Sequence, residues 1–224
     1  MARLNDSEII ASWHSNAEPW VRAVREQQIE SRKLVTNAAI VEAILHAAPR
    51  SVLDVGCGEG WLVRELAQRG VQATGIDVVP GLIDAANAAG GGDFRVVAYE
   101  DIAAAKFDHG FDVVACNFSL IGNESVDTLL AAVPALLSPR GRLIVQTLHP
   151  VVACGEQPYQ DGWREGSWAG FSNAFRDPAP WYFRTLQSWV QLFGRHGFHV
   201  REMREPVHPN TQKPVSIIFI AELN

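Results

Sequence analysis

Residues 52–60 read VLDVGCGEG, and this stretch decides the fold of the 224-residue chain. An apolar strand ends at Val55, three glycines follow at alternate positions, and a segment of helical character begins at Gly60. Glycine permits a sharp turn and a close approach of the backbone to a ligand, and the free N–H groups of the following helix favour carboxylate or phosphate. The turn therefore predicts a site for a nucleotide-like ligand.

An acidic residue further along supports this prediction. Asp77 closes the next predicted strand, roughly 20 positions after the first glycine, where a carboxylate can take both hydroxyls of a ribose. A GxGxG turn by itself can also be a helix start that packs closely and binds nothing, and the strand, the helix and Asp77 together argue against that alternative. Trp61 stands where a dinucleotide fingerprint needs a small residue, which counts against a nicotinamide-dependent dehydrogenase.

Outward from this turn, short apolar runs alternate with helical segments. Strands are predicted at 51–55, 72–77, 94–98, 111–117 and 142–147, and helices at 60–69, 81–89 and 125–137. Such apolar strands, separated by helices, indicate a parallel sheet with both faces covered. Two helices are predicted between residues 9 and 47, and the chain ends in a helix at 185–196 and strands near 199–203 and at 216–221.

Composition excludes several classes of protein. The net charge is −6, 47% of residues are hydrophobic, and no run of Lys or Arg is present, which argues against nucleic acid and anionic membranes as partners. No apolar run is long enough to span a bilayer, and residues 1–10 do not resemble a signal peptide. Three cysteines without paired spacing favour a reducing cytoplasm. His196 and His199 straddle Gly197 without a completing ligand, so no metal site is expected.

Four motifs occur in a familiar order: LDVGCGEG at 53–60, GID at 75–77, FDVVACNFSL at 111–120 and SPRGRLIV at 138–145. Over residues 51–148 the sequence resembles the class I S-adenosylmethionine-dependent methyltransferases. The pattern WxxLFxxxGF at 189–198 is similar to the small-molecule O-methyltransferases of the ubiquinone-biosynthesis type. The resemblance implies a Rossmann-like α/β fold: a seven-stranded sheet of order 3-2-1-4-5-7-6, its last strand antiparallel, with helices on both faces.

The same resemblance divides the chain into four segments. Residues 1–48 are expected to form an N-terminal helical cap, 49–149 the cofactor-binding core, 150–184 a substrate lid insertion, and 185–224 a C-terminal helix and β-hairpin that complete the sheet. The 150–184 segment is long and rich in Gly and Pro, yet it is also rich in aromatic residues, which argues against disorder.

The resemblance implies S-adenosylmethionine as the cofactor. The three glycines would line its methionine part, Asp54 would hold its ammonium directly or through water, and Asp77 would take its ribose. Ala98 stands where the family commonly offers an Asp to the adenine, so Tyr99, Glu100 or Asp101 would substitute. The expected cofactor-binding residues are Asp54, Gly56, Cys57, Gly58, Gly60, Asp77, Val78, Tyr99, Glu100, Asp101, Asn117 and Phe118. Cys57 is better explained as a small filler of the glycine loop, and Asn117 can equally be a strand-end cap.

Methyl transfer from a sulfonium is an in-line displacement, so the protein mainly aligns the acceptor and excludes water. A general base helps only if the acceptor is a hydroxyl or a protonated amine. His149, after the fifth strand, is the first candidate for base or orienting residue, although it can equally cap the strand end. Tyr182 is the second catalytic candidate, and Glu124, His14 and Arg184 are weaker ones. Arg32 could meet the cofactor carboxylate, although an Arg there is more often a surface residue.

Five tryptophans lie outside the predicted core: Trp13, Trp20, Trp163, Trp168 and Trp181. They are expected to line the substrate site and favour a flat or apolar acceptor, or else only to fasten a loop-rich cover. The predicted function is methyl transfer to a small, aromatic or apolar O- or N-acceptor by a cytoplasmic monomer or homodimer. The alternative is a non-catalytic protein that binds or senses S-adenosylmethionine.

Overall fold

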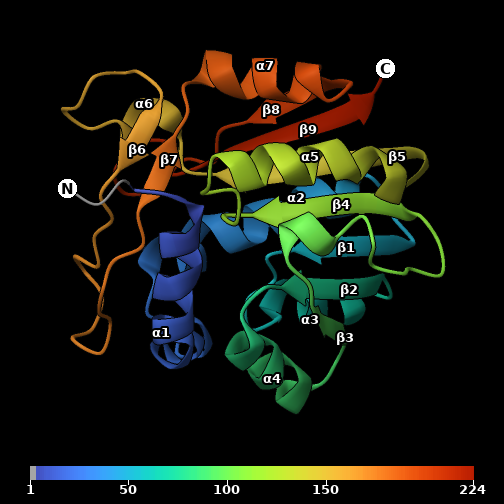
Figure 1. Cartoon of the computed structure of the whole chain (residues 1–224), viewed down its shortest axis with the longest axis horizontal. Coiled ribbons are helices and arrows are strands. Elements are labelled where there is room, and N and C mark those ends of the chain that lie inside the picture. Colours follow the sequence, from blue (N-terminus) through green and yellow to red (C-terminus); the bar gives the residue numbers. More distant parts are fainter. Residues whose placement is uncertain (1–3) are drawn as a thin grey trace.

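A computed structural model describes residues 4–224, and its centre is a seven-stranded sheet in the order β3-β2-β1-β4-β5-β9-β8 (Figure 1). The first five strands are parallel, and β9 runs antiparallel to both of its neighbours. The predicted strand order is thereby confirmed. The strands are β1 Ser51–Val55, β2 Gln72–Asp77, β3 Asp93–Val96, β4 Phe111–Asn117, β5 Leu137–Thr147, β8 Phe198–Arg204 and β9 Ile217–Leu223.

Helices cover both faces of this sheet. α5 (Glu124–Leu136) and α7 (Leu186–Arg195) bury their apolar residues in one core, and α2 (Asn37–His46) and α3 (Trp61–Ala67) in the other. α7 illustrates the local cause: Trp189, Leu192 and Phe193 recur at helical spacing and are buried, while the Thr185 side chain caps its first turn. α4 (Pro80–Ala89) packs beside β3. Across residues 4–224, every helix falls short of the length or apolarity needed to cross a membrane.

The N-terminal segment crosses the carboxyl ends of the parallel strands, toward which the arrowheads point in Figure 1. α1 (Asp6–Arg25) packs beside α4, and its Asp6 carboxylate accepts the N–H groups of Asn123 and Ser125 at 2.8 and 2.6 Å. The chain then enters α2 through a π-helical turn, η1 (Arg32–Thr36), which the sequence did not predict. Both ends of this turn line the functional site described below.

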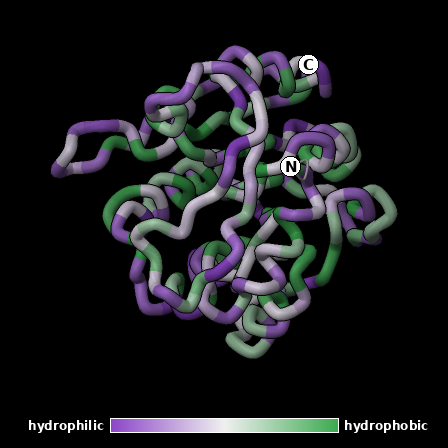
Figure 2. Tube along the Cα trace, turned by 60° about the vertical axis from the view of Figure 1, so that its left-hand side comes forward, coloured by the Kyte–Doolittle hydropathy of each residue, from purple (hydrophilic) through white to green (hydrophobic). Residues whose placement is uncertain are grey.

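A cover follows β5 and consists of α6 (Pro150–Ala153) and a small antiparallel sheet of β6 (Gly162–Arg164) and β7 (Trp181–Phe183). The sequence did not predict this sheet, because three-residue strands carry too little periodicity to be recognised. A cross-strand pair of Trp163 and Tyr182, with ring centroids 5.6 Å apart, holds it together. In Figure 2, where this side comes forward, hydrophilic residues are interspersed along the covering chain.

β5 begins at Leu137, earlier than the predicted start at Arg142. Leu137 pairs with Phe111, and the ladder then shifts register before Val113 meets Arg142. The sequence between them contains Pro139 and Gly141 and resembles a turn, so the pattern hid an irregular strand. The shift lies at the amino end of the pair, away from the site.

Candidate active site

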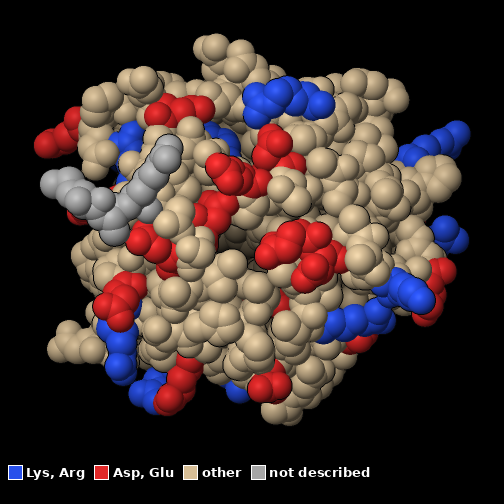
Figure 3. Space-filling model, viewed as in Figure 1, with Lys and Arg blue, Asp and Glu red and all other residues tan. Residues whose placement is uncertain are grey.

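A cavity of about 510 Å³ lies over the carboxyl ends of β1, β2, β4 and β5. β2 and β4 flank β1 on opposite sides, so the connections diverge at this point, where open α/β sheets bind their ligands. α1, η1 and the cover supply the other walls. The face seen in Figure 3 is hollowed between acidic side chains.

The glycine turn forms the floor of this cavity. Gly58 has φ +58°, and a side chain added there would meet only the Trp20 ring nitrogen, at 3.5 Å, so its backbone is open to a ligand. Gly60 differs from the prediction: it precedes α3, and an added side chain would strike the Phe94 ring at 2.4 Å. Gly60 thus allows close packing beneath the turn and does not line the cavity. Cys57 lines it as a buried thiol, and burial raises its pKa well above the ordinary value.

Asp77 fastens the turn to β2. Its carboxylate accepts the N–H groups of Gly58 and Val79, each at 2.9 Å, and lines the cavity. Burial raises the pKa of Asp77, while these backbone hydrogen bonds lower it. A carboxylate has about four lone-pair sites, so these two hydrogen bonds do not use up the acceptor capacity of Asp77. The position is the one expected of a ribose-binding residue.

Within residues 4–224, three buried polar atoms of the cavity wall have no hydrogen-bond partner: Arg32 Nη2, Thr36 Oγ1 and Asp54 Oδ1. The Arg32 guanidinium lies between two rings, 5.6 Å from the centroid of Trp20 and 5.0 Å from that of Trp61. Its burial lowers the pKa of Arg32 to about 10. Buried polar groups are normally paired, so these atoms indicate a ligand that supplies their partners.

Asp54 is the negative counterpart of Arg32. Burial, together with the charge of Asp77, raises the pKa of Asp54 to about 7, and Arg32 opposes that rise. A cation placed against Oδ1 and an anion placed against Arg32 would satisfy both groups. The pair therefore fits the ammonium and carboxylate of one amino acid, and Asp77 lies next to it for an attached sugar. The residues present fit S-adenosylmethionine.

Near Asp77 the cavity is also lined by apolar residues and by part of η2 (Tyr99–Asp101). Val78, Val79 and Leu82 line this part, which suits a flat base. The buried Tyr99 hydroxyl donates to the Ser119 carbonyl at 3.1 Å, so its ring forms a wall, and burial raises its pKa. Glu100 lines the cavity but Asp101 does not, so of these two predicted carboxylates only Glu100 borders the space.

The remaining wall is aromatic and joins α1 to the cover. Trp13 contacts Trp20 and Trp168 edge to face, with ring centroids 5.0 and 5.8 Å apart. The Asn16 side chain binds the backbone of Arg176 in both directions, donating to its carbonyl at 2.7 Å and accepting its N–H at 3.0 Å. The chamber between α1 and the cover is thus bounded by large apolar surfaces and held by a buried amide.

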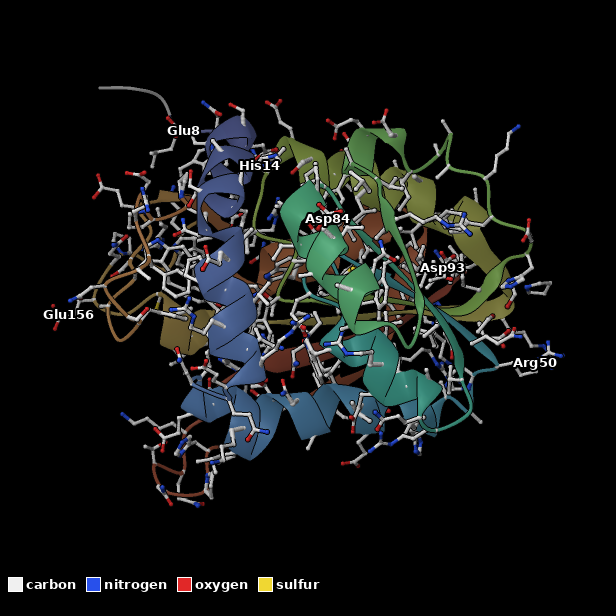
Figure 4. All side chains as sticks on the ribbon, turned by 90° about the horizontal axis from the view of Figure 1, so that it is seen from below. Glu8, His14, Arg50, Asp84, Asp93 and Glu156 are labelled. Atoms are coloured by element: carbon white, nitrogen blue, oxygen red, sulfur yellow. The ribbon has the colours of Figure 1, made fainter. Side chains whose placement is uncertain are left out.

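Tyr182 and Arg184 stand on one side of this chamber. The guanidinium lies 4.8 Å from the Tyr182 ring centroid and donates to the Gly122 carbonyl at 2.8 Å. Arg184 thereby fastens the cover to the loop after β4, and burial lowers its pKa to about 10. Of the weaker candidates, Arg184 lines the cavity, whereas Glu124 and His14 do not. Figure 4 shows His14 on the side of α1 that faces α4 and α5.

His149 does not line the cavity. It is 4% exposed, and its Nε2 lies 2.7 Å from Glu205 Oε1. Its buried Nδ1 has no partner in the part of the chain that the structure describes. The chain turns into α6 at Pro150 and directs the imidazole toward the loop before β9, while Thr147 and Leu148 line the cavity instead. His149 therefore contacts Glu205 and does not border the space where an acceptor would bind. This placement argues against a role as the general base.

Replacing His149 by glutamine should therefore leave the turnover number within roughly a factor of two, because the ring does not contact the reacting groups. The free energy of unfolding should fall by about 1 kcal/mol as the contact with Glu205 weakens. Chemical denaturation and initial rates check both expectations. A turnover loss on the order of a hundredfold in a stably folded variant would restore His149 as the base.

Fifteen of the predicted site residues line this one cavity, and four do not: Gly60, Asp101, His149 and Trp163. Trp163 lies across β6 and β7 from Tyr182, beyond the chamber wall. The sequence favoured a surface position for Arg32, and it did not predict Thr36 as a site residue. Their spacing of four residues was the available signal, since it puts two polar side chains on one side of a helical turn. The residues that line the cavity as predicted are Trp13, Trp20, Asp54, Gly56, Cys57, Gly58, Asp77, Val78, Tyr99, Glu100, Asn117, Phe118, Trp168, Trp181 and Tyr182.

This fold and this site define a class of proteins with a Rossmann-like sheet and a cleft for an amino-acid-bearing nucleoside. The sequence model described as "Methyltransferase domain" matches residues 26–203, and the chain belongs to this methyltransferase domain family. The predicted family is confirmed.

Known proteins with similar sequences or structures agree with this assignment. A ubiquinone biosynthesis O-methyltransferase of Xanthomonas oryzae pv. oryzae is 38% identical over 114 residues, which are 49% of this chain and 47% of the relative. The chain thus matches about half the length of this relative. A putative S-adenosylmethionine dependent methyltransferase from Listeria monocytogenes has a similar structure, with TM-score 0.65, 20% identity and coverage of 83% and 97% of the two chains. The Burkholderia thailandensis 1,6-didemethyltoxoflavin-N1-methyltransferase gives TM-score 0.66 at 18% identity, covering 100% and 93%. At these identities the structural likeness establishes the fold.

Proposed function

We propose that this protein transfers the methyl group of S-adenosylmethionine to a small, aromatic or apolar O- or N-acceptor. The observation that carries the proposal is the arrangement of Arg32, Asp54 and Asp77 around one cavity at the carboxyl ends of β1 and β2. Arg32 Nη2 and Asp54 Oδ1 have no partner among the described residues, and together they suit the carboxylate and the ammonium of an amino acid, with the Asp77 carboxylate lining the same cavity. An oxygen acceptor is favoured by the relatives, which are named as O-methyltransferases.

Bound S-adenosylmethionine supplies an electrophilic methyl group on a positively charged sulfur. The residues of this chain then have three tasks. Asp54 and Arg32 hold the two charges of the amino-acid part, and Asp77 holds the sugar. The chamber of Trp13, Trp168 and neighbouring rings orients a flat acceptor and keeps water away. Tyr182 remains the catalytic candidate inside the chamber, where its hydroxyl can orient the acceptor.

In this proposal residues 49–149 form the cofactor-binding core and 185–224 complete its sheet. Residues 1–48 and 150–184 act together as cap and lid over the acceptor. The amide contact from Asn16 to Arg176 and the ring contacts of Trp13 join the two segments. We further infer a cytoplasmic location, which agrees with three unpaired cysteines in the described part of the chain.

The chamber favours catalysis over the alternative of a non-catalytic binder. A protein that only senses the cofactor needs no second space beside it, yet the cavity continues past Asn117 and Phe118 to Trp181 and Phe171. That space is lined mainly by apolar residues, as an acceptor site requires.

Two measurements test the proposal. Calorimetry with S-adenosylhomocysteine is expected to give saturable binding, and incubation with S-adenosylmethionine and a panel of phenols and aromatic amines is expected to give a methylated product by mass spectrometry. Absence of binding heat and of any thermal shift with either cofactor form would overturn the proposal. Tight binding with no product from any acceptor would support the sensing alternative.

A further inference from the structure

Gln146 is a buried polar residue that follows the apolar run 143–145 of β5, and it is 1% exposed. Its amide nitrogen donates to the Thr36 carbonyl at 3.1 Å and to Asn117 Oδ1 at 2.7 Å. Its amide oxygen accepts the Ser216 hydroxyl at 3.1 Å. One side chain therefore joins η1, β4 and the segment that leads into β9. Such a buried amide is tolerated because its hydrogen-bonding groups are satisfied.

These contacts fix which way the Asn117 amide points. The Thr36 partner is a backbone carbonyl, which can only accept, so the Gln146 atom beside it must be the nitrogen. The same nitrogen reaches the Asn117 side chain, so the Asn117 atom beside it must be the oxygen. Asn117 lines the cavity, and with its oxygen bound to Gln146 the NH₂ group is the part of the amide that remains to donate to another partner. The orientation follows from the network and not from an arbitrary choice between nitrogen and oxygen.

The donors of this part of the cavity form one corner. Gln146 holds both Asn117 and Thr36 with a single nitrogen, so these two residues are neighbours. The Thr36 hydroxyl and Arg32 Nη2 are buried and belong to the same π-helical turn, and neither has a partner among the residues that the structure describes. The group that accepts from all three must be rich in oxygen lone pairs, as a carboxylate is. The unpaired Asp54 Oδ1 lines the same cavity and suits an accompanying ammonium.

We propose that Gln146 is a positioning residue that turns the Asn117 amide into a donor and sets Thr36 beside it, so that this corner binds the carboxylate of the cofactor's amino-acid part. The inference rests on the proposed function. Gln146 itself does not touch the ligand, because it lies behind Asn117 and Thr36. Gln146 determines whether Asn117 offers the ligand a hydrogen-bond donor or an acceptor.

The sharpest variant is Gln146→Glu, which keeps the size of the side chain but removes its donors. A carboxylate there would face the Thr36 carbonyl and would turn the Asn117 amide around, so that its oxygen points into the cavity. Affinity for S-adenosylhomocysteine is expected to fall on the order of 10- to 100-fold. Affinity for 5′-methylthioadenosine, which has the sugar and base but no amino-acid carboxylate, should stay within about twofold. Both dissociation constants are measured by calorimetry.

Two further variants keep the test decisive. Asn117→Asp leaves the oxygen that faces Gln146 in place and replaces the donor in the cavity by an acceptor, so the same selective loss is expected even if Gln146→Glu fails to fold. Ser216→Ala is the matched control, because it removes a bond to Gln146 without changing either donor. Its affinity for S-adenosylhomocysteine should change by no more than about threefold.

The outcomes separate this inference from the proposed function. Wild-type protein that binds neither ligand would refute the proposed function. If the wild type binds both ligands, equal losses of both in Gln146→Glu and Asn117→Asp would mean that the network only supports the fold, and the inference fails. Unchanged affinity for S-adenosylhomocysteine with a raised KM for the acceptor would also overturn it, because Asn117 would then serve the acceptor.

Discussion

Asp77→Ala is expected to weaken the binding of S-adenosylhomocysteine by on the order of 1–3 kcal/mol, or roughly 5- to 150-fold. Two effects add. The ligand's sugar hydroxyls lose a charged acceptor, and the glycine turn loses the carboxylate that holds the N–H groups of Gly58 and Val79. Because the sugar is present in both ligands, the loss should be similar for 5′-methylthioadenosine, in contrast with the selective loss expected at Gln146.

Asp77→Asn provides the control for this experiment. The amide keeps one oxygen, which can still accept one of the two backbone N–H groups, so an intermediate loss is expected. Calorimetry measures the affinity, and circular dichroism confirms that the variants remain folded. Full wild-type affinity in Asp77→Ala would show that the ribose assignment is wrong.

The affinity for S-adenosylhomocysteine should also depend on pH through Asp54. Burial and the charge of Asp77 raise the pKa of Asp54 to about 7, so below that pH the free protein holds a proton there. Pairing with the ligand's ammonium requires the carboxylate, so binding releases this proton. The affinity contributed by Asp54 should therefore fall by up to about tenfold per pH unit below 7 and level off above it.

Asp54→Asn should remove this pH dependence and lower the affinity at pH 8. 5′-Methylthioadenosine has no ammonium and should lack the same slope with wild-type protein. The free energy of unfolding should depend on pH in the opposite direction from the affinity. The folded-state pKa lies above the ordinary value of 3.8, so the Asp54 contribution to stability is greatest below pH 3.8 and is lost as pH rises through about 7. Titration calorimetry between pH 5 and 8 is the measurement, and a slope that Asp54→Asn retains would contradict the assignment.

The parts of this protein that local sequence determines were predictable. Apolar runs of strand length separated by helical segments predicted a parallel sheet with both faces covered, because parallel strands need crossover connections. The order of the strands followed from the resemblance to the class I methyltransferases. The glycine turn and Asp77 followed from spacing, since each residue acts where its own strand ends. The short sheet of β6 and β7 was missed because its stability comes from Trp163 and Tyr182 meeting across strands, which adjacent residues do not reveal.

The other site residues come from segments that are far apart in the sequence and meet only in the folded chain. Arg32 and Thr36 reach the cavity through a π-helical turn. Their four-residue spacing indicates that they share one side of a helical turn, but it does not reveal that the turn is π-helical or that it borders the cavity. Gln146 is recognisable only once Thr36, Asn117 and Ser216 are seen around it. The prediction for His149 assumed that a residue at the end of a strand faces the cleft, but the turn at Pro150 sends its side chain elsewhere. The direction of a side chain just after a strand is set by the turn that follows. The alternation of inward and outward side chains along the strand does not predict it.

The cation between Trp20 and Trp61 gives the molecule an optical property of practical use. Both indoles border the place where a ligand's carboxylate would meet Arg32, so occupancy changes the electric field and the solvent around two native fluorophores. Ligand titrations can therefore follow intrinsic emission without a label, and Trp61→Phe and Trp20→Phe would assign the signal to each ring.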